Sequence, residues 1–339
     1  MPGQTAGWDR LRLRLRSEAP PLYPPAPRPA GSPAADCEVC RGPVRPGFAR
    51  CYQCDRHALL GSVLLADAVV PISYAIKGTP FADDLWRYKS APFPPSSPPT
   101  SASPPASASA PKSASAPASS PAPASSPAPK SASAVMPASA AAPASTPSPA
   151  AAPTPASAPT PASAPTPALV ATPALVATPA LARASVLALM LAFLTDHGPC
   201  VWQRAGMPPP DRLAVVPTGA GRPGPHPLLR LVWPYLRLPG CSLVLRPGRQ
   251  GRDLDLDRFQ VLARPAGASV LLLDDTWVSG ASAQSAAAAL KLAGARHVAV
   301  IVLGRHVNPD DAASASLLAG LAAARYDPSA CAVHPPAAK

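Results

Sequence analysis

The residues best suited to chemistry lie in one short segment, Val270 to Ser282, with the sequence VLLLDDTWVSGAS. Its apolar first half predicts a buried strand that stops at two carboxylates, and a loop of small, hydroxylated residues then leads into a helix. Backbone N–H groups at a helix start attract phosphate, and carboxylates accept hydrogen bonds from vicinal sugar hydroxyls. The alternative is an ordinary crossover with a polar turn. The predicted sugar-phosphate contacts are Asp274, Asp275, Thr276, Ser279, Gly280, Ala281 and Ser282.

Four cysteines form a second cluster with the spacing of a metal site. Two Cys-x2-Cys pairs are separated by ten residues, and their members are Cys37, Cys40, Cys51 and Cys54. Four thiolates complete a closed tetrahedral Zn²⁺ site, which is structural because no position stays open for a substrate. Two disulfides or a redox pair are the alternative. We expect His57 to be a surface residue, and we interpret the pair Cys331-x2-His334 as incidental rather than as half of another metal site.

The segments around the acidic pair predict alternating strands and helices. We expect strands at 213–216, 243–245, 269–273 and 298–303, and helices at 184–195, 226–236 and 283–293, the last with Ser282 as N-cap and Gly294 as C-cap. This alternation indicates βαβ units. The predicted fold class is therefore α/β, an open parallel sheet flanked by helices.

An earlier loop supplies weaker candidates for a second phosphate contact. The apolar run from Leu213 ends in Pro-Thr-Gly, where Thr218, Gly219 and Arg222 are candidates for a pyrophosphate loop. A plain turn after a buried strand explains these residues equally well. Three arginines before the acidic motif could also meet pyrophosphate, although each is better explained singly as a solvated surface residue: Arg246, Arg249 and Arg252.

Composition divides the chain of 339 residues into unequal parts. The 53 prolines cannot be accommodated in packed elements, and the stretch 91–182 is almost wholly Pro, Ala, Ser and Thr, which predicts a disordered spacer rather than a glycosylated or binding stalk. The net charge of +12 suits polyanionic ligands. We predict an N-terminal arm at 1–35, a zinc ribbon at 36–60, two parts of one domain at 61–90 and 183–325, and a tail at 326–339.

Together these motifs resemble the ComF-like family, in which a zinc ribbon precedes a type I phosphoribosyltransferase domain. The resemblance implies that the acidic segment binds 5-phosphoribosyl 1-pyrophosphate (PRPP) with Mg²⁺, and that the domain transfers the phosphoribosyl group to a nitrogen acceptor. The segment from Ala75 to Ser90 is similar to the family's connection between ribbon and domain. The Pro/Ala/Ser stretch interrupts the domain where the family continues directly, so we expect it to loop out from the surface rather than to separate the halves.

Two other functions stay open beside the enzyme. The chain could bind a nucleotide without turnover, or it could contact single-stranded DNA and the competence machinery through the ribbon and a basic surface. Aromatic and basic residues alternate from Trp86 to Lys89, which fits a nucleic-acid surface but also the packing edge of a helix. We expect a cytoplasmic protein without a membrane span, because the longest apolar run, 186–194, is shorter than the ~20 residues required.

Overall fold

The computed structural model describes residues 36–90, 178–218, 225–322 and 326–334. The N-terminal arm and residues 91–177 of the Pro/Ala/Ser-rich stretch lie outside the described residues. The last residues of that stretch, predicted to be a disordered spacer, are the start of helix α4 (Pro179–Arg204). Within the described ranges the helices and strands are, in chain order, α2 (Tyr52–Leu59), β1 (Ala68–Ile76), α3 (Pro80–Arg87), α4 (Pro179–Arg204), β2 (Arg212–Val215), α5 (Pro227–Leu236), β3 (Leu243–Leu245), β4 (Phe259–Val261), β5 (Ser269–Trp277), α6 (Ala281–Leu292), β6 (His297–Val307) and α7 (Ala315–Ala322).

The centre of the fold is a parallel sheet of four strands in the order β1-β6-β5-β2. The predicted βαβ unit is confirmed, because β5 and β6 pair in parallel and α6 connects them. The strand β1, from the part before the Pro/Ala/Ser stretch, pairs along its length with β6 from the part after it. The two parts therefore share one sheet.

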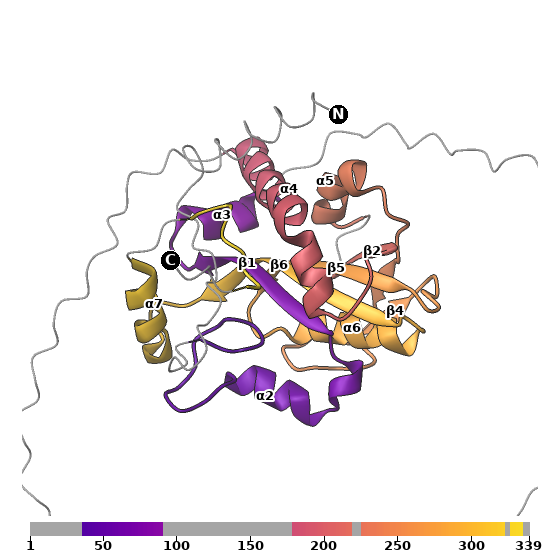
Figure 1. Ribbon diagram of the computed structural model, residues 1–339, viewed down its shortest axis with the longest axis horizontal. Coiled ribbons are helices and arrows are strands. Elements are labelled where there is room, and N and C mark those ends of the chain that lie inside the picture. Colours follow the sequence, from indigo (N-terminus) through magenta and orange to yellow (C-terminus); the bar gives the residue numbers. More distant parts are fainter. Residues whose placement is uncertain (1–35, 91–177, 219–224, 323–325, 335–339) are drawn as a thin grey trace, which may run out of the picture. The chain divides into compact units, whose positions relative to one another are not determined.

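Helices cover both faces of this sheet, which makes three layers (Figure 1). On one face α3, α4 and α5 share a hydrophobic cluster with the strands. On the other face α6 and the hairpin of β3 and β4 pack together with the cysteine-rich segment. This arrangement confirms the predicted fold class of a parallel sheet flanked by helices.

Several details of the predicted elements are wrong. The helix predicted at 184–195 is longer and runs from Pro179 to Arg204, and the C-cap of α6 is Ala293 rather than Gly294. The strand β5 does not stop at the carboxylates but continues to Trp277, because its partner β6 is long enough to pair that far. The N-cap of α6 is Gly280 rather than Ser282. The short strand β3 forms an antiparallel hairpin with β4 instead of joining the sheet.

The helix α4 is the one described helix that is long and apolar enough, by length and composition, to cross a membrane. More than half of its apolar window, 56%, is buried inside the structure. Residues such as Val186 and Leu189 are fully buried against the sheet cluster. Such burial is what the core helix of a three-layer α/β protein requires.

Candidate functional site

The acidic pair sits on β5, near the edge of the sheet where parallel strands end. Because successive side chains of a strand point to opposite faces, the pair is split: Asp275 is buried with 6% exposure, and Asp274 is partly exposed. Thr276 shares the partly exposed side with Asp274. The two carboxylates therefore have different surroundings and different chemistry.

Asp275 accepts contacts from three side chains that the sequence did not connect with it. The Tyr88 hydroxyl donates a 2.6 Å hydrogen bond to Oδ2, and the Lys89 ammonium lies 2.7 Å from the same oxygen. Nε2 of His226 approaches Oδ2 at 3.5 Å. Tyr88 and Lys89 follow α3, and His226 precedes α5, so two separate loops meet at one buried carboxylate.

The orientation of His226 follows from its second nitrogen. Nδ1 accepts a hydrogen bond of 3.0 Å from the backbone N–H of Leu228, and His226 is thereby the N-cap of α5. A nitrogen that accepts carries no proton, so in the neutral imidazole the proton is on Nε2. That proton faces Asp275, which places a donor against the carboxylate in the neutral as well as in the charged form.

These contacts give the two carboxyl groups opposite pKa shifts. Burial alone would raise the pKa of Asp275, but the charges of Lys89 and His226 and the hydrogen bonds from Lys89 and Tyr88 lower it below its usual value. Burial, followed by the adjacent charge of Asp275, raises the pKa of Asp274 to about 7. Asp275 is thus a fixed anion, and Asp274 exchanges its proton near neutral pH.

The loop after β5 brings the chain tightly into α6. Gly280 has φ +80°, a conformation that other residues rarely adopt, and a Cβ there would collide with the Trp277 ring. Ser279 Oγ accepts a 3.3 Å hydrogen bond from the N–H of Ala281. The first intrahelical bond runs from Gln284 N–H to Gly280, so the N–H groups of Ser282 and Ala283 precede it and have no acceptor within the helix. These groups are the donors that a phosphate at this helix start would use.

A buried arginine that the sequence reading missed reinforces this helix start. Arg258 is 3% exposed, and its Nη1 donates to Ser282 Oγ at 3.2 Å. Its Nε has no hydrogen-bond partner among the described residues. The segment before it also contacts the loop, because Ser279 Oγ donates to the carbonyl of Arg252 at 3.1 Å. A guanidinium and a helix dipole together favour an anion here.

The other candidate phosphate contacts are only partly within the described residues. Thr218 follows β2, whose neighbour in the sheet is β5, and so lies on the same edge as the acidic pair. Gly219 and Arg222 lie outside the described residues. Arg249 forms ion pairs of 3.6 and 3.7 Å with Asp255 and Asp257.

The alternating residues before the Pro/Ala/Ser stretch do not form a common outer surface. Trp86 is 71% exposed, but Tyr88 is fully buried and Lys89 turns to Asp275. The segment is the packing edge of α3, which is the alternative that the sequence left open. The alternation therefore gives no support to a nucleic-acid surface.

The four cysteines of the ribbon converge as their spacing predicted. Their sulfur atoms all lie within 4.8 Å of one another, and Cys40 and Cys51 are 3.7 Å apart, close to the spacing of about 3.8 Å for sulfurs bound 2.3 Å from a tetrahedral zinc. Contact with the Cys37 sulfur, together with Cys54 and the charge of Arg305, lowers the pKa of the Cys40 thiol to about 7. The donor set and its geometry fit Zn²⁺.

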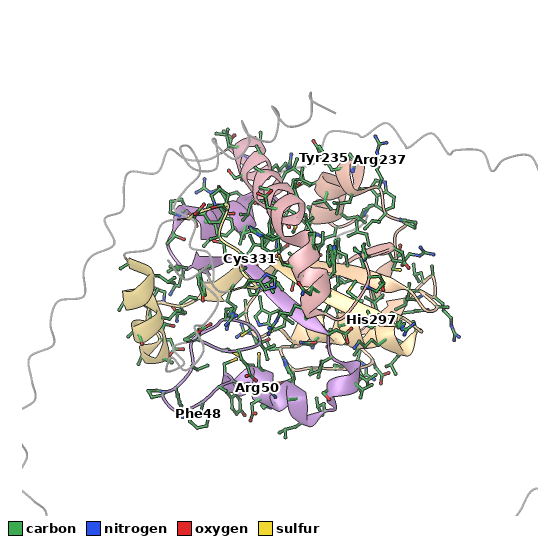
Figure 2. All side chains as sticks on the ribbon, in the orientation of Figure 1. Phe48, Arg50, Tyr235, Arg237, His297 and Cys331 are labelled. Carbon is green, nitrogen blue, oxygen red and sulfur yellow. The ribbon has the colours of Figure 1, made fainter. Side chains whose placement is uncertain are left out.

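The cluster is joined to the sheet by Arg305, near the end of β6. Its guanidinium packs on Gly42, where a Cβ would collide with it, and donates a 2.9 Å hydrogen bond to the carbonyl of Trp277. The loop between the two cysteine pairs, with Phe48 and Arg50, points outward (Figure 2). The cysteine cluster thus shares a buried arginine with the end of strand β5.

The prediction that His57 is a surface residue is wrong. It lies on the buried side of α2, three residues after Cys54, with 3% exposure. Neither ring nitrogen has a hydrogen-bond partner among the described residues. Burial is the main reason that its pKa is lowered.

No protein-family model matches the chain, and no curated protein matches it. Among solved structures, the chain is similar to a purine phosphoribosyltransferase from Pyrococcus horikoshii Ot3. The identity is 13%, the match covers 36% of this chain and 86% of that chain, and the TM-score is 0.23. The geometry of this chain itself defines an α/β protein with a split acidic pair before a glycine-capped helix and a four-cysteine cluster beside it.

Proposed function

We propose that this chain is a ComF-like phosphoribosyltransferase homologue that binds PRPP, or a ribose 5-phosphate nucleotide, at the carboxyl end of β5. The observation that carries the proposal is the order of residues after the apolar part of β5: the Asp274 carboxylate comes first, and the start of α6, capped by Gly280, follows within a few residues. This order offers a partly exposed carboxylate for vicinal ribose hydroxyls and, a few residues on, backbone donors for the 5′-phosphate. Arg258 adds a buried positive charge beside those donors.

Mg²⁺ belongs to the proposal as the ion that accompanies pyrophosphate. The Asp274 carboxylate and the Thr276 hydroxyl offer hard oxygen ligands on the partly exposed side of β5, which fits the preference of this ion. The ion would neutralise charge on the leaving pyrophosphate. The role of the chain's own residues is to hold the ribose and the 5′-phosphate so that C1 faces the acceptor.

The transfer step would form a bond between C1 and a nitrogen of the acceptor, and break the bond between C1 and the pyrophosphate oxygen. Pyrophosphate leaves with the bonding electrons, and the nitrogen loses a proton. Asp274 is placed to stabilise positive charge that develops on the ribose ring, provided that it is ionised. A cytoplasmic location is part of the proposal, because reduced thiolates persist there.

Nucleotide binding without transfer is the second candidate, and the contacts of Asp275 favour it. In the sugar-phosphate interpretation both carboxylates face the ribose, but Asp275 is occupied by Tyr88, Lys89 and His226. With Asp274 as the one available carboxylate of the pair, the site can still bind a sugar phosphate, but it has one fewer negative group to stabilise the transition state of transfer.

Calorimetric titration of PRPP with Mg²⁺ into the full chain tests the proposal. We expect the wild type to bind and Asp274→Asn to bind at least about tenfold more weakly. The control is Asp211→Asn, which should bind as the wild type does, because Asp211 directly precedes β2 and so lies at the other edge of the sheet from Asp274. Absence of binding to the wild type, or equal binding to all three proteins, would contradict it. Release of pyrophosphate with a panel of nitrogen bases then separates transfer from binding alone.

A further inference from the structure

A second group of metal-binding side chains lies far from the ribbon, between α4 and the C-terminal segment. His197 and Cys200 belong to α4, where a separation of three residues puts them on the same side of the helix. Cys331 comes from the segment after α7. The ligand atoms of these three residues all lie within 4.8 Å of one another. Figure 2 labels Cys331 beside α4 in that view.

The histidine of this group is oriented as a metal ligand is. His197 is 7% exposed, and its Nε2 lies 3.2 Å from the carbonyl oxygen of Pro328. A carbonyl only accepts, so Nε2 carries the proton and Nδ1 has a lone pair to offer. Histidines that bind metals commonly donate their other N–H to a carbonyl or carboxylate in this way.

The Cys331 sulfur is held in place by the turn that follows it. The backbone N–H groups of Val333 and His334 both point at Sγ, at 3.4 Å each. These contacts fix the sulfur beside the ligand atoms of His197 and Cys200.

The side chain of His334 stands on the same turn and is exposed, but it is not one of the three residues whose ligand atoms all lie within 4.8 Å of one another. Its Nδ1 lies 3.7 Å from the Cys331 sulfur. A sulfur and a nitrogen bound to one tetrahedral zinc lie about 3.5 Å apart. The four residues thus form two pairs, His-x2-Cys from the helix and Cys-x2-His from the C-terminal segment.

We propose that His197, Cys200 and Cys331 bind a second Zn²⁺ ion, and that the exposed side chain of His334 turns toward the ion as the fourth ligand. Two thiolates and two imidazoles are a usual ligand set for structural zinc. The C-terminal segment packs on the cluster that contains α4 through Tyr326, Ala332 and Val333. The ion fastens this segment to α4, and it closes a loop between residues that are 131 positions apart in the sequence, Cys200 and Cys331.

Zinc content of the full chain, purified under reducing conditions and saturated with Zn²⁺, tests the second site. We expect two ions per chain for the wild type and one for the double variant Cys200→Ser, Cys331→Ser. The matched control is Cys241→Ser, a buried cysteine outside both groups, which should keep two ions. Cobalt substitution adds a second reading, because loss of a site with two thiolates removes less sulfur-to-metal absorption than loss of a site with four.

His334→Ala covers the case in which the double variant does not fold, because His334 is exposed and its removal leaves the packing intact. This variant should bind the second ion at least about tenfold more weakly. Loss of a residue that only hydrogen-bonds to a metal ligand already weakens metal binding by about that factor. A single zinc in the reduced wild type would overturn the proposal, as would two ions retained by the double cysteine variant. If that single-zinc protein forms a disulfide between Cys200 and Cys331 once the reductant is removed, the pair is a redox crosslink rather than a metal site.

Discussion

The Tyr88 hydroxyl donates a 2.6 Å hydrogen bond to Asp275, a residue 187 positions further along the chain. The two residues lie on either side of the Pro/Ala/Ser-rich stretch in the sequence. The bond therefore connects the part of the chain before this stretch to the proposed ribose-binding strand β5. Lys89 contacts the same carboxylate oxygen. The end of α3 is therefore part of the site and more than a packing edge.

Tyr88→Phe should destabilise the protein without a cavity, because only the hydroxyl is lost. A hydrogen bond to a charged acceptor contributes about 1.5–3 kcal/mol, so we expect the free energy of unfolding in urea to fall by about 2 kcal/mol. The control is Tyr52→Phe, whose ring is 71% exposed and which should change stability by less than about 0.5 kcal/mol. Equal stability of both variants would mean that the Tyr88 bond contributes nothing.

The two adjacent carboxylates should respond differently to loss of charge. Asp275→Asn leaves the Lys89 ammonium facing a neutral group in a buried setting, which costs about 3–5 kcal/mol when a buried pair is broken. Asp274→Asn removes a carboxylate whose charge the protein disfavours, so it should stabilise the fold or leave it unchanged while weakening PRPP binding. Thermal or urea unfolding of the two variants, side by side, checks this contrast. Similar destabilisation by both would contradict the split between anchor and ligand.

The contribution of Asp274 to stability should fall as pH rises from about 4 to about 7. The pKa of Asp274 is raised to about 7 by burial and by Asp275, so the folded chain keeps a proton that the unfolded chain releases. The loss is at most about 4 kcal/mol, from 1.36 kcal/mol per pKa unit. Asp274→Asn should remove this contribution, so that the stability of the variant falls less, or rises more, than that of the wild type over this pH range. A smaller contribution of the same sign should remain in the variant, because burial also raises the pKa of Asp84, to about 6. An unchanged slope in the variant would contradict the raised pKa.

Much of the fold could be predicted, because apolar runs and small-residue turns are local signals. The strand at 213–216 and the βαβ unit around α6 follow from such runs. The continuation of β5 past the carboxylates could not be predicted, because it depends on pairing with β6. Asp274 and Asp275 read as equivalent in sequence, and only the pleat of the strand and the arrival of Lys89 separate them.

The partners from distant loops were beyond sequence reasoning for a different reason. His226, Tyr88 and Arg258 belong to common residue types at unremarkable spacing, and their roles arise from the loops that bring them to β5 and α6. His57 was misjudged because a histidine after a cysteine pair carries no signal of burial. The second Cys-His group was divided between a helix and the C-terminal segment, so neither half had a complete metal-site spacing.

Gly280→Ala should damage the proposed phosphate loop severely. The new Cβ would meet the Trp277 ring, and φ +80° is strained for alanine. We expect a loss of at least about 2 kcal/mol in unfolding experiments, since the left-handed backbone alone costs about 1–2 kcal/mol. Gly248→Ala is the control, because Gly248 has φ +75° with open space around it and should show the backbone cost alone. A loss no larger than that of the control would show that Trp277 moves aside easily.

Removal of zinc from the four-cysteine cluster should weaken the whole sheet domain, not the ribbon alone. Cys37, Cys40 and Cys54 belong to the same hydrophobic cluster as Val270 and Leu272 of β5. When the ion leaves, the four thiolates lose the cation that balances their charge, the buried Arg305 guanidinium alone does not replace it, and the cluster opens. Cys40→Ser, or treatment with a strong chelator, should lower the midpoint of a single thermal transition and also weaken PRPP binding, whereas Cys241→Ser with its zinc intact should keep that binding. Two separate transitions, with the main one at the wild-type temperature, would show instead that the ribbon folds independently of the sheet.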